Sequence, residues 1–238
     1  MAEPEEEFEF APWDGRRVPV TLIGGYLGSG KTTAINAMLS RTTRPTAVLV
    51  NDVGPVNIDA SLVKARHGDT IELTDGCVCC SLAQGLASAF ATIADRPSPP
   101  DHLVIELSGV ADPRRVVAWA NSPGFRLDST IVLVDAERVT DLVEDDLIAP
   151  YVLAQIDAAD LLITTKLDLI DRVRAEHVRS VIAELAPTTL VVDGDSADAI
   201  AALLDLASRQ PGSAVALAPP QLFDPHVVTT IPLPHGAT

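Results

Sequence analysis

The chain has 238 residues, 47% of them hydrophobic, which is enough for one main α/β domain with a substantial core. Its 33 acidic and 17 basic residues give a formal net charge of −16 at pH 7. A surface field of that sign repels the phosphate backbones of nucleic acids and anionic lipid headgroups, so we expect no nucleic-acid partner and no membrane partner.

The N-terminal segment, residues 1 to 15, is rich in glutamate and lacks the positive start and long apolar stretch of a secretory signal. No apolar run in the chain reaches the roughly 18 to 20 residues that a membrane-spanning helix needs. We therefore predict an acidic flexible tail and a cytoplasmic location.

Short runs rich in β-branched residues and leucine alternate with helix-like stretches along the chain. The predicted strands are Val18 to Ile23, Ala47 to Val50, His102 to Leu107, Thr130 to Val134, Leu161 to Thr164 and Thr189 to Val192. The predicted helices are Lys31 to Leu39, Leu82 to Ile93, Arg114 to Ala120, Arg172 to Leu185 and Ala197 to Ser208. This alternation predicts the α/β class, with a mostly parallel sheet and helices on both faces.

The domain boundaries follow from composition. The last residues, 211 to 238, begin with Pro211-Gly212-Ser213 and are rich in proline, which punctuates regular structure. We predict one core domain over residues 16 to 210, followed by a Pro-rich tail or the vestigial start of a second domain.

A glycine-rich loop follows the first predicted strand, where residues 25 to 32 read Gly-Tyr-Leu-Gly-Ser-Gly-Lys-Thr. The glycines let backbone amides turn toward phosphate oxygens without a Cβ in the way. A chance glycine-rich turn is the alternative, but the full pattern between a strand and a helix favours a P-loop nucleotide site. The residues assigned to nucleotide phosphates are Gly25, Gly28, Ser29, Gly30, Lys31, Thr32 and Thr33.

Lys31 and Thr32 carry most of the chemistry predicted for this loop. Lys31 supplies a point charge to the β and γ phosphates, and the Thr32 hydroxyl can coordinate Mg²⁺ where the helix N-terminus adds its partial positive charge. Thr33 would contact an inner phosphate.

A second acidic loop is predicted where the strand from His102 ends, in the sequence Glu106-Leu107-Ser108-Gly109. Glu106 would hold Mg²⁺ through water, and Gly109 could present its amide to the γ-phosphate, which makes this loop a candidate switch. Glu106 could instead be a solvated residue at a strand end, and Asp135, which closes the next strand, is a rival Mg²⁺ ligand.

The base of the nucleotide would be chosen by Thr165-Lys166-Leu167-Asp168, also at a strand end. The Asp168 carboxylate can accept both guanine N1–H and N2–H, whereas adenine offers neither donor there, and a buried carboxylate left unpaired discriminates strongly. Lys166 would lie along the base face. A solvated Lys/Asp loop is an equally good interpretation of these four residues taken alone.

All three cysteines of the chain, Cys77, Cys79 and Cys80, lie in one loop before a predicted helix. Thiolates suit Zn²⁺, Cu⁺ or another borderline-to-soft metal, and Asp52, Glu72, Asp75, a histidine or water could complete the site. The alternative is a turn filled by three unreactive, partly buried cysteines.

These motifs together resemble the CobW family of metal-chaperone GTPases, relatives of the UreG and HypB nickel-insertion proteins. The resemblance covers most of residues 18 to 170. It rests on Gly24 to Thr33, Asn51-Asp52-Val53-Gly54 through Ile58-Asp59, Asp75-Gly76-Cys77-Val78-Cys79-Cys80, Glu106-Leu107-Ser108-Gly109-Val110-Ala111-Asp112-Pro113 and Gln155-Ile156-Asp157-Ala158-Ala159-Asp160.

The resemblance implies a P-loop GTPase that uses GTP and Mg²⁺ and delivers a transition metal, zinc or cobalt, to a client metalloprotein. It implies that Cys77, Cys79 and Cys80 bind the transferred metal. It also implies that Lys31, Thr32 and Glu106 bind Mg-GTP.

The sequence departs from the family pattern in several places. Thr165 stands where the family usually has asparagine, and Pro55 stands where it has an acidic residue. Family members commonly continue into a second α/β domain, of which we expect only a vestige here.

Two other functions compete with a metallochaperone. A nucleotide-dependent regulatory or assembly switch with little turnover is the first, suggested by Leu107 in place of a small hydroxyl residue. A small-molecule kinase is the second, although it would leave the cysteine loop without a purpose. The sequence leaves open whether the protein forms a homodimer.

Overall fold

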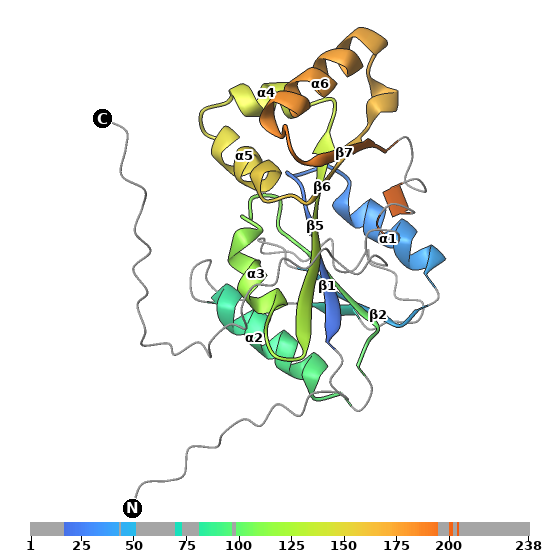
Figure 1. Cartoon of the computed structure of the whole chain (residues 1–238), viewed down its shortest axis with the longest axis vertical. Helices are drawn as coiled ribbons and strands as arrows, with labels where there is room; N and C mark the ends of the chain where they lie inside the picture. The colour runs from blue at the N-terminus through green and yellow to red at the C-terminus, as the bar shows by residue number, and fades with distance from the viewer. Residues whose placement is uncertain are drawn as a thin grey trace, which may run out of the picture.

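The computed structural model describes residues 17–42, 44–50, 70–72, 81–96, 99–194, 200–201 and 204. Within these residues, seven strands form one parallel sheet in the order β3-β2-β4-β1-β5-β6-β7 (Figure 1). The strands are β1 (Val18–Gly24), β2 (Thr46–Val50), β3 (Thr70–Glu72), β4 (His102–Glu106), β5 (Phe125–Asp135), β6 (Leu161–Thr165) and β7 (Leu190–Asp193). The predicted α/β class with a parallel sheet is confirmed.

Helices connect most of these strands and cover both faces of the sheet. They are α1 (Lys31–Arg41), α2 (Ser81–Ala94), α3 (Arg114–Ala120), α4 (Val139–Glu144), α5 (Ala149–Asp157) and α6 (Arg172–Leu185), with a short 3-10 helix η2 (Leu167–Leu169). Figure 1 shows α1 on one side of the strands and α2, α3 and α5 on the other. In the part of the chain that the structure describes, no helix is long and apolar enough to cross a membrane.

The predicted elements mostly have the predicted ends. Helices α3 and α6 match their predicted ranges, and α6 begins where the Asp171 side chain accepts a hydrogen bond from the Arg174 amide, an N-cap contact. Strand β5 is longer than predicted, because it starts at Phe125 rather than Thr130. The prediction missed β3, α4 and α5, of which the first two are too short to show a periodic pattern.

Three predicted segments lie wholly or partly outside the described residues. The acidic start and the Pro-rich end are both outside them, so the domain boundaries stay predictions. Of the helix predicted from Ala197 to Ser208, residues 200, 201 and 204 are described, and all three are helical.

The core consists of two layers, because alternate residues of each strand point to opposite faces. Ile131 and Leu133 of β5 pack with α1, whereas Val132 and Val134 pack with α4, α5 and α6. A third cluster lies on the same face of the sheet as Val132 and Val134 and packs β1, β2 and β4 against α2 and α3. The sheet is thus a fixed platform for the loops that follow its strands.

The chain changes direction at the middle of the sheet. Strand β1 lies between β4 and β5, so strands β2 to β4 lie on one side of β1 and strands β5 to β7 lie on the other. In open parallel sheets, ligands bind beyond the carboxyl ends of the strands at such a point. The register brings Ile23 beside Glu106 and Asp135 beside Thr165, so the predicted site residues gather at the carboxyl ends of the central strands.

Candidate nucleotide site

The loop between β1 and α1 has the backbone geometry that a phosphate cradle needs. Gly25, Gly28 and Gly30 all have positive φ angles, of 134°, 81° and 95°. A Cβ at Gly25 would collide with Ser29 Oγ and the Leu133 carbonyl, so a larger residue cannot close the loop in this way. Gly30 then occupies the N-cap position of α1, whose first turn contains no acidic residue. The positive end of the helix therefore faces the loop.

Lys31 and Thr32 both point into this region. The Lys31 Nζ donates hydrogen bonds to the carbonyls of Gly25 at 2.8 Å and Tyr26 at 3.4 Å, and the side chain is only 8% exposed. The Thr32 hydroxyl donates to Glu106 Oε1 at 2.7 Å. Glu106 is buried at the end of β4, beside Ile23 of β1.

A hydroxyl and a carboxylate side by side at the mouth of a phosphate loop are the oxygen donors that Mg²⁺ prefers. The structure brings Thr32 and Glu106 together, as the sequence predicted, and their donor set fits Mg²⁺. Coordination of the ion by these two residues stays a prediction.

The rival Mg²⁺ ligand, Asp135, has other partners. Its Oδ2 forms an ion pair with Lys166 Nζ at 2.6 Å, and its Oδ1 accepts a hydrogen bond from the Glu137 amide at 3.0 Å. Asp135 thus stabilises the loops after β5 and β6. The geometry favours Glu106 as the acidic partner of Thr32.

The predicted base loop follows β6, with two differences from the expectation. Lys166, which we expected to lie along the base, has a φ angle of 61° and is directed to Asp135. Asp168, expected to be buried, lies exposed on η2, so discrimination by burial would require a bound base to cover this carboxylate. The loop is tied to the phosphate loop because the Thr165 hydroxyl donates to the Ser29 carbonyl at 3.1 Å.

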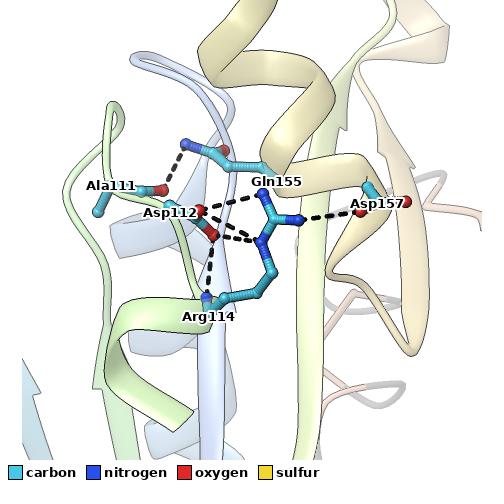
Figure 2. Close-up of polar contacts among 5 residues, drawn as sticks. All are labelled: Ala111, Asp112, Arg114, Gln155 and Asp157. Carbon is cyan, nitrogen blue, oxygen red and sulfur yellow. Dashed lines mark hydrogen bonds and ion pairs between the residues drawn. The ribbon is translucent and has the colours of Figure 1, made fainter. Parts of the chain in front are cut away.

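The loop between β4 and α3, residues 107–113, contains the candidate switch residues and is called the switch loop below. It packs directly against the phosphate loop, residues 25–30, between β1 and α1. A Cβ at Gly109 would lie about 2.6 Å from the Leu27 side chain, so only glycine fits this approach. The Gln155 side chain, from α5, binds both loops: it accepts a hydrogen bond from the Gly25 amide at 3.0 Å and donates to the carbonyls of Gly109 at 2.9 Å and Ala111 at 3.1 Å. Figure 2 shows Gln155 reaching from α5 to Ala111.

A second contact between α5 and the switch loop is more exposed. Arg114 binds Asp112 with several of its nitrogens and reaches Asp157 at 3.1 Å (Figure 2). Partial burial raises the pKa of Asp112, but the hydrogen bonds and charge of Arg114 outweigh this effect and hold the pKa below its usual value. The Asp112 carboxylate is therefore charged at neutral pH.

Sequence reasoning missed the roles of Gln155 and Arg138. The exposed Arg138, just after β5, donates to the Leu27 carbonyl at 3.3 Å and so supports the phosphate loop from outside. For Gln155 the sequence holds two signals: it is a polar amide among the apolar residues of α5, and it opens one of the motifs that carry the family resemblance. For Arg138 we find no signal in the sequence.

The predicted transition-metal site lies outside the described residues. Cys77, Cys79, Cys80, Asp52 and Asp75 all belong to segments of which no structure is described. Among the residues that are described, no three His, Cys, Asp or Glu side chains are grouped as a metal site. The metal ligands therefore stay a prediction from the sequence.

The sequence of this chain is similar to those of known proteins. A family model described as CobW/HypB/UreG, nucleotide-binding domain, matches residues 19–193. A zinc chaperone CobW from Sinorhizobium is 30% identical over 219 residues, covering 79% of this chain and 62% of that protein. The zinc chaperone YjiA from Escherichia coli K12 is 33% identical over 189 residues, covering 75% of this chain and 58% of that protein. The chain thus spans about three fifths of the length of these relatives.

Solved structures with the same fold include two related proteins. The Zn(II)-bound YjiA GTPase from E. coli aligns with a TM-score of 0.55 and 24% identity, covering 74% of this chain and 57% of that one. HypB from Helicobacter pylori in complex with nickel aligns with a TM-score of 0.56 and 20% identity, covering 81% of this chain and 87% of that one. At these identities the likeness concerns the fold.

Proposed function

Because this chain belongs to the CobW/HypB/UreG family of nucleotide-binding domains, we propose that it is a GTP-hydrolysing metallochaperone. The protein binds GTP with Mg²⁺, and Cys77, Cys79 and Cys80 bind zinc or cobalt. The bound nucleotide controls both the binding of this metal and the transfer of the metal to a client metalloprotein. The observation that supports the nucleotide half most directly is the hydrogen bond from Thr32 to Glu106 beside the phosphate loop.

The phosphate groups would be held by the loop and the start of α1. The amides of the glycine-rich turn and the positive end of α1 provide donors for the phosphate oxygens. Lys31 already lies within the loop, where its ammonium group bonds main-chain carbonyls, so a small rearrangement would turn it to the β and γ phosphates. Thr33, next along the helix, would contact an inner phosphate.

The hydrolytic step would use Thr32, Glu106 and Gly109. Thr32 and Glu106 would hold Mg²⁺, which neutralises charge on the phosphate oxygens when it is bound. The Gly109 amide would donate to the γ-phosphate, because Gly109 already packs against the phosphate loop at Leu27. Removal of the γ-phosphate would then free this loop to move.

Preference for guanine would rest on Asp168, whose carboxylate can accept both guanine donors. Its exposure leaves it accessible to a base that arrives from solvent. Thr165 and Lys166 would hold the base loop in place through Ser29 and Asp135 rather than contact the base.

The metal half of the proposal rests on the cysteines and on the names of the relatives. Three clustered thiols suit zinc, and zinc-binding thiols must stay reduced, so a metal site of this kind fits the proposed cytoplasmic location. The zinc chaperones CobW and YjiA are among the similar proteins, which favours zinc over cobalt as the transferred metal.

The test measures bound zinc and GTP hydrolysis together. We would compare the wild type, purified without chelator, with a variant carrying Cys77→Ser, Cys79→Ser and Cys80→Ser. We expect about one zinc per wild-type chain, its loss in the variant, and hydrolysis that responds to zinc only in the wild type. Hydrolysis without zinc in either protein would overturn the metallochaperone and leave a plain GTPase. Nucleotide binding without turnover would favour a regulatory switch.

A further inference from the structure

Gln155 has an unusual position for an amide side chain. It is 1% exposed, and its three hydrogen bonds go to the main chain of two different loops rather than to its own helix. Its oxygen accepts from Gly25, at the start of the phosphate loop, while its nitrogen donates to Gly109 and Ala111 in the switch loop. Both kinds of hydrogen-bonding atom on the side chain are therefore used.

The groups that Gln155 binds are parts of the proposed nucleotide machinery. Gly25 opens the loop that would hold the phosphates, and Gly109 carries the amide that would meet the γ-phosphate. Gly109 and Leu27 are already in close contact, so the two loops cannot approach each other more closely. A shift of the switch loop by the length of a hydrogen bond would break both donations from Gln155.

We propose that Gln155 is a positioning residue that couples the switch loop to the phosphate loop and so sets the preference of this site for a triphosphate over a diphosphate. The inference deepens the proposed function and rests on it. With the Gly109 and Ala111 carbonyls held by Gln155, the Gly109 amide stays beside the phosphate loop, ready to donate to the γ-phosphate. A diphosphate does not use that amide, so its affinity depends less on Gln155.

A purely structural role makes a different prediction. If Gln155 only satisfied buried main-chain groups, its loss would lower stability and weaken both nucleotides by the same factor. The ratio of the two affinities therefore separates the positioning role from the structural one.

The experiment measures the affinity of the full chain for GDP and for a non-hydrolysable GTP analogue, both with Mg²⁺. The main variant is Gln155→Met, which keeps the length of the side chain without adding charge. We expect the affinity for the GTP analogue to fall about tenfold more than that for GDP, because two neutral hydrogen bonds that fix the switch loop are lost.

Two further variants complete the comparison. Tyr151→Phe removes the hydroxyl of an exposed residue on the same helix, Tyr151 being 49% exposed, and should leave the affinity ratio unchanged. Gln155→Glu keeps the acceptor for Gly25 but loses both donations, so it should change the ratio like Gln155→Met. A change of the ratio in Gln155→Glu that is absent in Gln155→Met would be the effect of a buried charge and would overturn the proposal.

The outcomes distinguish this inference from the proposed function. If the wild type binds both nucleotides and Gln155→Met weakens them equally, the inference fails and the proposed function stands. If the wild type binds neither, both fail. Should Gln155→Met not fold, hydrogen exchange of the wild type decides. Peptides covering the phosphate loop (25–30) and the switch loop (108–112) should change protection together between GDP and the GTP analogue, and independent changes would contradict the coupling.

Discussion

The two ends of strand β4 both carry a buried ionisable residue, and their surroundings differ. Glu106, at the carboxyl end, accepts a hydrogen bond from Thr32 beside the glycine-rich loop. His102, at the amino end, shares a hydrogen bond with Thr21 at 2.9 Å and lies 3.4 Å from Arg44. Burial, and then the charges of Arg44 and Arg126, lower the pKa of His102 to about 3.

The comparison teaches that a strongly shifted pKa does not by itself mark a functional site. The shift of His102 has a structural cause, because a buried imidazole near two guanidinium groups stays neutral. The candidate nucleotide site is recognised instead by loops with positive φ glycines and by side chains that converge on them. We therefore expect changes at Glu106 to alter activity and changes at His102 to alter stability.

The largest effect should come from Glu106→Gln, which keeps the shape and an acceptor for Thr32 but removes the charge. We expect GTP hydrolysis to fall about 10²- to 10³-fold, since this charge would hold Mg²⁺ against the phosphates. Urea unfolding of the same variant should show a stability within about 1 kcal/mol of the wild type. Hydrolysis at the wild-type rate would remove Glu106 from the site.

The next effect is an acid sensitivity that His102 confers. The unfolded chain binds a proton at this residue below pH 6.5, whereas the folded chain does so only near pH 3. Stability is therefore lost as the pH falls from 6.5 toward about 3, and unfolding measured at pH 7 and pH 5 should differ by about 2 kcal/mol from this residue. His102→Asn should remove that part of the pH dependence.

His177 provides the matched control for this measurement, because it is exposed on α6. His177→Gln should keep the acid sensitivity of the wild type. If His177→Gln loses it and His102→Asn retains it, the assignment to His102 is wrong.

A smaller effect is expected from Thr165, at the carboxyl end of strand β6. Thr165→Val removes the hydroxyl that binds the Ser29 carbonyl, with little change of shape. Loss of about 1 kcal/mol should weaken GTP binding roughly fivefold in an equilibrium titration. The control is Thr164→Val, because the Thr164 hydroxyl is buried without a hydrogen-bond partner among the described residues and its loss should be neutral or stabilising.

The smallest effect is expected for Arg138→Ala. Its guanidinium is exposed and makes one long hydrogen bond to the Leu27 carbonyl, so GTP affinity should fall no more than about threefold. Arg172→Ala, whose partner is the exposed Glu176, should leave the affinity unchanged. A loss of more than tenfold for Arg138→Ala would mean that this side chain contacts the nucleotide itself.

Much of the fold could be predicted because its signals are local. Val18 to Ile23 is a short apolar run, and the glycines at positions 25 and 30 delimit a turn. Asp171 caps a helix by accepting a hydrogen bond from the Arg174 amide, three residues along the chain. Short elements such as α4 escaped because six residues do not complete a periodic pattern. Of the candidate site, the contact between Thr32 and Glu106 follows from the motif positions.

The glycine-rich loop, the parallel sheet and the family could be inferred from the sequence, because each depends on residues adjacent in the chain or on motifs in a set order. Three contacts became visible in the folded chain alone: Asp135 pairs with Lys166, Thr165 binds Ser29, and Gln155 joins two loops. The last two contacts span 136 and 130 residues of sequence. Such partners meet because the packed sheet brings the carboxyl ends of distant strands together, and no local propensity encodes that approach.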